Sequence, residues 1–322
     1  MNPYNTTSPV IFCIFNRPKT TQRVFNEIAK AKPPELYVVA DAARPQVQGE
    51  AELCQECRAI AEQVDWPCEV TLDYAEDNMG CKQRIYSGIS NAFKQFEFAI
   101  ILEDDCLPSS DFFRFVDTMR ERYQNDEQVM HISGTSFVRP KNPNAAYYRS
   151  AYPLVWGWAT WKRAWVGLDL SMKNWPKLKA RLTSERSNHA ATHSRFLKHL
   201  EKAYTGSVNT WDYPYCAHIM NSYGNCITPL FNLVKNIGFG KESTHTGNSL
   251  SPQSNLPHDK LPYEICPTKV AALHNYYSGI QLENGIYRPR KIMRMFYKIC
   301  SYLRLPIKAK LYRPREQKLI VK

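Results

Sequence analysis

The 322-residue chain contains no continuous apolar run of about 18 residues, which argues against a membrane-spanning helix. Its start, Met1 to Asn5, has neither a basic segment nor an apolar core, so no secretory signal peptide is expected. Without an export signal, the ten scattered cysteines are expected to be reduced thiols rather than a disulfide framework. These absences predict a cytoplasmic protein.

Several ligand-binding motifs are also missing. The chain has no Walker loop and no Gly-x-Gly-x-x-Gly, so neither a P-loop enzyme nor a dinucleotide dehydrogenase is supported. Cys54 and Cys57 have zinc-like spacing, but they lie in a helical pattern and no second such pair follows, which favours a structural role. No RNA- or DNA-binding motif is present, so no specific nucleic-acid partner is expected.

The positive charge is concentrated at the end of the chain. The net charge is +12, from 42 Lys and Arg against 30 Asp and Glu, and residues 286–322 hold twelve of the basic residues and only one acid, Glu316. This tail has an apolar stripe at helical spacing and predicts a basic amphipathic helix. It could lie on an anionic membrane surface through residues 288–315, at the inner face of the membrane, dock on the protein itself, or bind nucleic acid.

Strand-like and helix-like patterns alternate from residue 10 to residue 134. The strands are predicted at residues 10–15, 36–40, 69–72, 98–102 and 129–134, and the helices at 18–31, 50–64, 85–93 and 112–123. Such alternation predicts an α/β fold, with a mostly parallel, Rossmann-like sheet flanked by helices.

The most informative stretch is the apolar strand 98–102 followed by Glu103, Asp104 and Asp105. Carboxylates at the carboxyl end of a buried strand lie where open α/β sheets bind ligands. Three of them repel one another and attract a divalent cation. The alternative is an acidic loop that only precedes the next helix, whose start Asp111 could cap.

Polar residues also follow the other predicted strands. They are Phe15, Asn16 and Arg17 after the first, Asp41 after the second, and Asn78, Gly80 and Arg84 after the third. Right-handed crossovers bring the ends of parallel strands to one edge of the sheet. These residues are therefore expected to surround a nucleotide-type crevice.

The second half of the chain contains three further candidates. The glycine in Trp156-Gly157-Trp158 would let a sugar ring approach aromatic faces, although a buried core strand explains the segment equally well. Asp212 is a candidate general base or a helix cap. His245 is a candidate metal or phosphate ligand, although a surface histidine is the simpler interpretation.

The order of these motifs resembles the nucleotide-diphospho-sugar glycosyltransferases of the GT-A fold over about residues 8–246. The pattern is most similar to the branch of N-acetylglucosaminyltransferase I and its bacterial relatives. The specific part is Glu103-Asp104-Asp105 with its preceding strand, and the other matches are weak one by one. Eukaryotic members carry an N-terminal membrane anchor, and its absence here predicts a bacterial-type cytosolic enzyme.

The resemblance implies roles for individual residues. Mn²⁺ or Mg²⁺ would be bound by Asp105, with His245 as a further ligand, while Asp104 would contact the ribose or the metal shell and Glu103 the donor sugar. The remaining nucleotide-sugar-binding positions would be Phe15, Asn16, Arg17, Asp41, Asn78, Gly80 and Arg84, with Trp156, Gly157 and Trp158 on the acceptor-side loop. Asp212 matches the position of the catalytic base.

The sequence thus predicts a metal-dependent, inverting glycosyltransferase with a nucleotide-diphosphate sugar donor, a UDP-sugar being favoured. The acceptor would be a hydroxyl of a glycan or of a lipid-linked glycan. Residues 1–130 would bind the nucleotide sugar, 131–285 would form the acceptor-side half of the same domain, and 286–322 the basic tail. The alternatives are a nucleotidyltransferase with the same acidic metal site and a non-enzymatic protein that binds nucleic acid or membranes.

Overall fold

The computed structural model describes residues 4–137, 145–184, 190–239, 256, 258–261 and 270–271. His245 and the basic tail, residues 286–322, lie outside the described residues. Within the described residues, none of the helices has the length and apolar character needed to cross a membrane.

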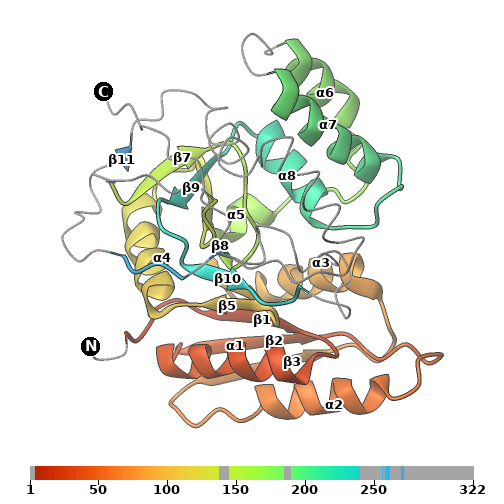
Figure 1. The fold of residues 1–322 in the computed structure, drawn as a ribbon, viewed down its shortest axis with the longest axis vertical. Helices are drawn as coiled ribbons and strands as arrows, with labels where there is room; N and C mark the ends of the chain where they lie inside the picture. Colours follow the sequence, from red (N-terminus) through yellow and green to blue (C-terminus); the bar gives the residue numbers. More distant parts are fainter. Residues whose placement is uncertain are drawn as a thin grey trace, which may run out of the picture.

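Nine of the described strands form one mixed sheet, in the order β11-β7-β9-β6-β8-β4-β1-β2-β3 (Figure 1). Their bounds are β1 Val10–Ile14, β2 Glu35–Ala40, β3 Glu69–Tyr74, β4 Phe98–Glu103, β6 Val129–Ser133, β7 Tyr147–Ser150, β8 Trp158–Trp161, β9 Asn225–Pro229 and β11 Val270–Ala271. The other two, β5 (Cys106–Pro108) and β10 (Val234–Asn236), form a small antiparallel sheet.

The predicted parallel arrangement holds for the half of the sheet built from β3, β2, β1 and β4. Beyond β4 the sheet becomes mixed, because β8 runs antiparallel to both β4 and β6. Further antiparallel pairing joins β7 to β9, while β6 and β9 are parallel. The fold is therefore α/β, with a parallel N-terminal half continued by a mixed C-terminal half.

Helices cover both faces of the sheet (Figure 1). One face carries α1 (Pro18–Ala31), α2 (Glu50–Ala61) and α4 (Ser110–Tyr123), and the other carries α3 (Gly80–Ala92), α5 (Lys162–Trp165) and α8 (Asp212–Asn221). The helices α6 (Trp175–Ser184) and α7 (Ala190–Tyr204) pack with α8 around a separate apolar cluster. This helical group lies at the end of the molecule opposite α2 (Figure 1).

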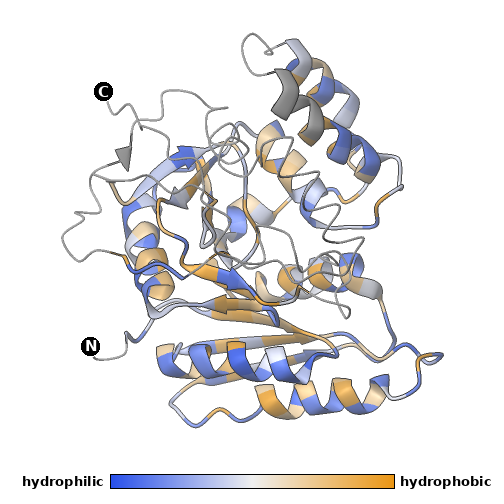
Figure 2. Cartoon of the chain, viewed as in Figure 1, coloured by the Kyte–Doolittle hydropathy of each residue, from blue (hydrophilic) through white to orange (hydrophobic). Residues whose placement is uncertain are grey.

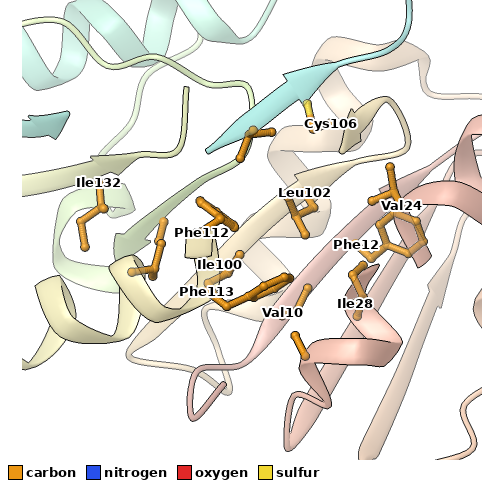
Figure 3. Packing of buried hydrophobic residues seen from close by; sticks show 14 of the residues in the cluster. Val10, Phe12, Val24, Ile28, Ile100, Leu102, Cys106, Phe112, Phe113 and Ile132 are labelled. Carbon is orange, nitrogen blue, oxygen red and sulfur yellow. The ribbon is translucent and has the colours of Figure 1, made fainter. Parts of the chain in front are cut away.

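Side chains that alternate in direction along the strands explain why helices cover both faces of the sheet. In β1, Val10 and Phe12 point toward α1, where they meet Val24 and Ile28 (Figure 3). The intervening Ile11 belongs to the cluster on the opposite face. Because successive strand residues point to opposite sides, a strand that is apolar at every position has to be buried on both faces.

The helices show the complementary pattern. In α1 the buried residues are Thr21, Val24, Phe25, Ile28 and Ala31, which fall on one face at helical spacing. Figure 2 shows hydrophilic residues on much of the remaining surface of α1 and α2. Pro18 occupies the first turn of α1, where its missing N–H leaves no intrahelical hydrogen bond unmade.

Candidate active site

The acidic residues lie in a turn at the carboxyl end of the parallel strands. Glu103 ends β4, Asp104 and Asp105 form the turn, and β5 begins at Cys106. Strand β10 pairs with β5, and the chain after it returns to the turn, where the Ile237 N–H donates a hydrogen bond of 2.8 Å to the Asp105 carbonyl. The backbone of the turn is therefore held by a segment more than 100 residues distant in sequence.

Arg17 connects this turn to the start of α1. Its carbonyl accepts hydrogen bonds from the Thr21 N–H at 3.0 Å and from the Thr21 hydroxyl at 2.9 Å, so the backbone of Arg17 is held by the helix. Its guanidinium forms ion pairs with both carboxylates of the turn, at 2.9 Å between Nη1 and Asp105 Oδ2 and through Nη2 with Asp104 Oδ1. The Phe15 N–H also donates to Asp104, at 3.3 Å.

The carboxylates outnumber the cation, and this shifts their titration. Burial and the charges of Asp105, Asp104 and Asp212 raise the pKa of Glu103 to about 8, although Arg17 opposes this shift. Burial also raises the pKa of Asp104 to about 6, again against Arg17. Burial alone would lower the pKa of Arg17, but the neighbouring carboxylates raise it well above its usual range. The guanidinium therefore stays charged, while the cluster retains uncompensated negative charge.

A cavity of about 330 Å³ opens beside the cluster. Its volume is at the lower end of the range of small-molecule sites. Five of the predicted site residues line it, namely Arg17, Glu103, Asp105, Trp156 and Asp212. Asp104 is 2% exposed and does not line the cavity, but it forms an ion pair with Arg17, which does. The structure thus brings together the acidic turn of the first half and the Asp212 region of the second.

Asp212 is the first residue of α8. Its Oδ1 accepts a 2.8 Å hydrogen bond from the Tyr213 N–H and another from the Thr210 hydroxyl, and its side chain lines the cavity. The N-cap position of α8 belongs to Trp211. Its charge contributes to the raised pKa of Glu103. Asp212 is therefore a cavity carboxylate in the first turn of α8, and the alternative interpretation as its N-cap is wrong.

Aromatic side chains also line the cavity. Tyr213 and His199 stack with ring centroids 5.5 Å apart and planes at 3°, and both line the cavity together with Trp156. Trp156 is itself packed edge-on against Phe239 at 5.7 Å. Aromatic faces next to carboxylates suit a ring that carries both apolar C–H groups and hydroxyls.

Asp41, Asn78 and Gly80 do not line this cavity and instead form the start of α3. The Asp41 carboxylate accepts the Met79 and Gly80 N–H groups, both at 2.9 Å. Asn78 donates to the Ala42 carbonyl at 2.6 Å and to Asp41 at 3.2 Å. Gly80 has a positive φ of 75°, which a glycine adopts without strain. In this structure these residues shape the edge of the sheet.

Three further predicted site residues make contacts within the protein, namely Asn16, Phe15 and Arg84. Asn16 donates to Glu50 at 2.8 Å, and the Phe15 ring lies 5.9 Å from the Arg44 guanidinium. Arg84 is buried, 4% exposed, and donates to the Ala40 carbonyl at 3.0 Å and to the Asp73 carboxylate at 2.6 Å. Arg84 therefore joins the ends of β2 and β3 and does not line the cavity.

The segment Trp156-Gly157-Trp158 contains both cavity-lining and core residues. Trp156 lines the cavity, whereas Trp158 is fully buried in β8 and stacks on His131 at 5.2 Å. Gly157 has a positive φ of 63°, and a Cβ there would lie 2.7 Å from Val234. Gly157 and Trp158 thus serve the core, and only Trp156 faces the cavity.

Some residues that line the cavity were not predicted from the sequence. They are Cys81, Val155, His199, Val208, Thr210, Trp211, Tyr213 and Asn236. Desolvation and the charges of Glu103 and Asp212 raise the pKa of Cys81 to about 12, so this thiol is protonated at neutral pH and is a poor nucleophile. His199 lies within an ordinary helical pattern, and nothing in its neighbouring sequence distinguishes it.

The donor chemistry of the acidic turn fits a hard divalent cation. Among the described residues, no three His, Cys, Asp or Glu side chains are placed to hold an ion by themselves. Mg²⁺, however, usually takes one or two carboxylates and completes its shell with water and substrate phosphates. Asp105 and Asp104 supply such carboxylates, in a cluster where the acidic side chains outnumber the one guanidinium, that of Arg17. His245 lies outside the described residues.

No protein-family model and no curated protein matches this sequence. Among solved structures, a UDP-glucose pyrophosphorylase in complex with UDP-glucose is 10% identical and covers 70% of this chain and 93% of its own, with a TM-score of 0.35. A mannosyltransferase from Pyrobaculum calidifontis, in complex with GDP-Man and Mn²⁺, is 14% identical and covers 68% of this chain and 75% of its own, with a TM-score of 0.33. Mouse xyloside xylosyltransferase 1 is 9% identical and covers 66% and 81%, with a TM-score of 0.31. At these values the similarities assign no activity to the chain.

Proposed function

We propose that the protein is a glycosyltransferase that transfers a sugar from a nucleotide-diphosphate donor to a hydroxyl group of a glycan. The observation that carries the proposal is the composition of one cavity, in which Asp105 and Glu103 of the strand-end cluster meet Asp212 and an aromatic wall. A group-transfer site needs a region that stabilises a charged leaving group and a base close to the acceptor. The two sides of the cavity offer these two functions.

The acidic turn would bind the donor. Asp105, supported by Asp104, would hold Mn²⁺ or Mg²⁺, and the bound cation would neutralise charge on the diphosphate as a Lewis acid. Arg17 lines the same cavity and carries five N–H donors in a planar fork that matches phosphate oxygens. Glu103, whose pKa is raised to about 8, is mostly protonated at neutral pH and could donate a hydrogen bond to a sugar hydroxyl.

Asp212 would act as the general base. Its carboxylate accepts the proton of the acceptor hydroxyl while the hydroxyl oxygen forms a bond to the anomeric carbon. The bond from that carbon to the diphosphate oxygen breaks, and the nucleoside diphosphate departs with the electron pair. One base without a carboxylate nucleophile predicts inversion at the anomeric carbon.

The aromatic wall would bind the acceptor. Tyr213 follows Asp212 directly, so a ring that stacks on Tyr213 lies next to the proposed base. The likeness to the N-acetylglucosaminyltransferase I branch, the preference for a UDP-sugar, the lipid-linked acceptor and membrane binding through residues 288–315 stay predictions.

A nucleotide panel tests the donor site. Nucleoside diphosphates and sugar nucleotides are added to the full chain with and without Mn²⁺, and the melting temperature is measured, because a ligand of the folded state raises it. We expect a Mn²⁺-dependent increase with one nucleotide and its loss in Asp105→Ala. Product analysis then decides the reaction: nucleoside diphosphate indicates glycosyl transfer, and pyrophosphate would identify a nucleotidyltransferase instead. No increase with any nucleotide would contradict the proposal.

Asp212→Asn tests the base. Asparagine keeps an oxygen for the Tyr213 N–H and so preserves the start of α8, but it cannot accept a proton. We expect kcat to fall by about 10²–10⁴-fold with the nucleotide-induced increase in melting temperature retained. Asp126→Asn, at a surface ion pair with Arg149, is the matched control and should leave kcat unchanged. Near-normal turnover of Asp212→Asn would remove Asp212 from the mechanism.

A further inference from the structure

The ion pairs of Arg17 have a consequence for how the acidic turn binds cations. Its guanidinium contacts both carboxylates of the turn, with Nη1 2.9 Å from Asp105 Oδ2. Asp104 is 2% exposed and Asp105 is 9% exposed. A second cation at Asp105 would have to share a buried oxygen with this guanidinium. Two positive charges at such a short distance repel each other strongly in a partly desolvated site.

The other side of Asp105 is closed by backbone. A Cβ added to Gly238 would lie 2.2 Å from Asp105 Oδ2 and 2.8 Å from Arg17 Nη1. The chain at Gly238 thus packs directly against the ion pair and is held there by the Ile237 hydrogen bond to Asp105. The Gly238 backbone and Arg17 thus both crowd Asp105 Oδ2, although the Asp105 side chain also lines the cavity.

Arg17 can leave the pair more readily than the carboxylates can. Its side chain is 22% exposed and lines the cavity, whereas its backbone is fixed at the start of α1. Among the described residues that line the cavity, it is the only Lys or Arg. If the side chain rotates away from the turn into the cavity, an anionic group bound there can accept the guanidinium through charge-assisted hydrogen bonds.

We propose that Arg17 is an internal counter-ion, whose guanidinium competes with a divalent cation for the carboxylates of Asp104 and Asp105. A cation binds Asp105 only when Arg17 has moved away, and a diphosphate in the cavity favours that movement by accepting the guanidinium. The idea rests on the proposed function for the identity of its ligands. It predicts that cation and nucleoside diphosphate bind cooperatively, because each removes an obstacle to the other.

The experiment measures the binding of Mn²⁺ alone to the full chain by isothermal titration calorimetry. Arg17→Gln removes the competing charge, and we expect it to bind Mn²⁺ at least tenfold more tightly than the wild type. Lys162→Gln is the matched control, because it also removes one positive charge but from a surface pair with Glu97 at the start of β4. Its Mn²⁺ affinity should stay within about twofold of the wild type, as expected for a screened surface charge.

Two further variants keep the test decisive. If Arg17→Gln does not fold, Arg17→Lys keeps the charge but lacks the planar fork that contacts both carboxylates, and we expect an intermediate gain in affinity. Asp105→Asn combined with either variant should abolish the gain. An affinity that is unchanged or weaker in both Arg17 variants would overturn the proposal, as would a gain that survives Asp105→Asn.

Nucleoside diphosphate provides the second measurement. Its presence should increase the Mn²⁺ affinity of the wild type more than that of Arg17→Gln, in which no guanidinium has to move. Failure of this inference and failure of the proposed function give different results. A chain that releases nucleoside diphosphate from a sugar nucleotide but shows no gain in Arg17→Gln retains the function without the competition. A gain in Mn²⁺ affinity in Arg17→Gln without any turnover would support the competition and contradict the proposed function.

Discussion

The role of a carboxylate in this protein depends on how many donors the surrounding chain supplies to it. Asp117 is buried and accepts hydrogen bonds from Tyr4, Thr6, Thr7 and Ser8, which ties residues 4–8 to α4. Asp41 is occupied in the same way by the start of α3. Asp105 shares the guanidinium of Arg17 with Asp104 and faces a cavity. Carboxylates that lack donors are the ones available to a ligand.

At the same scale, His131 predicts a dependence of stability on pH. It is fully buried in β6, and burial lowers its pKa to about 3, although a hydrogen bond to the Leu154 carbonyl opposes the shift. Its other ring nitrogen faces the phenol of Tyr215, which burial keeps neutral. The native state therefore keeps the imidazole neutral, while the unfolded state protonates it below about pH 6.5.

As the pH falls from about 6.5 toward 3, His131 binds a proton in the unfolded state but stays neutral in the native state. The free energy of unfolding should therefore fall by up to about 1.4 kcal/mol per pH unit from this residue alone. Urea unfolding of the wild type and of His131→Gln at pH 7.0 to 4.5 measures the effect. We expect the difference between the two proteins to shrink as the pH falls, and a constant difference would contradict the prediction.

At the scale of elements, the packing of α3 on β2 depends on the absence of a side chain. A Cβ at Gly88 would lie 2.3 Å from Val39 Cγ1 and 2.8 Å from Cγ2. The helix can therefore approach the sheet only because position 88 is glycine. Since α3 begins at the Asp41 cap and carries Cys81 into the cavity, its position also sets one wall of the site.

Gly88→Ala should destabilise the protein by about 1–3 kcal/mol, because overpacking outweighs the better helix propensity of alanine. Chemical denaturation measures this change. The double variant Gly88→Ala/Val39→Ala removes the methyl groups that clash, so its loss of stability should be smaller than the sum of the two single losses. Additive losses would show that the clash is relieved elsewhere.

At the scale of the whole molecule, one continuous sheet joins the two halves of the chain. Strand β8 pairs with β4 from the first half and with β6 from the second. The cavity in turn uses residues from both halves. The predicted division at residue 130 therefore runs through a shared sheet, which supports two halves of one domain as a working hypothesis.

This arrangement predicts cooperative unfolding. Six of the seven tryptophans lie between residues 156 and 211, so their fluorescence reports on the second half, whereas far-UV circular dichroism includes α1 to α4. We expect the two urea transitions to coincide. Phe12→Ala, in β1, should cost about 3–5 kcal/mol and shift both transitions equally. Separate transitions, or a shift only in the circular dichroism signal, would indicate independent domains.

Much of the fold could be predicted because its first half is built from local patterns. The strand predicted at 10–15 is observed at Val10–Ile14, and the helix predicted at 18–31 has those bounds. The small sheet of β5 and β10 and the antiparallel insertion of β8 were not predicted, since their strands are short or pair with distant partners. The spacing of apolar residues along the chain predicts each strand or helix, but it does not predict which strands pair with each other.

Sequence patterns alone were enough to predict the strands of the first half to within two residues at each end, and the acidic residues that follow β4. Which of the predicted residues line the cavity follows from long-range packing. This packing placed Asp212 beside Glu103, enclosed Asp41 and Arg84 in backbone hydrogen bonds, and set Arg17 against Asp104 and Asp105. Residue type specifies which hydrogen bonds a side chain can make. Long-range packing decides whether other parts of the protein occupy those hydrogen-bonding groups or leave them available to a ligand.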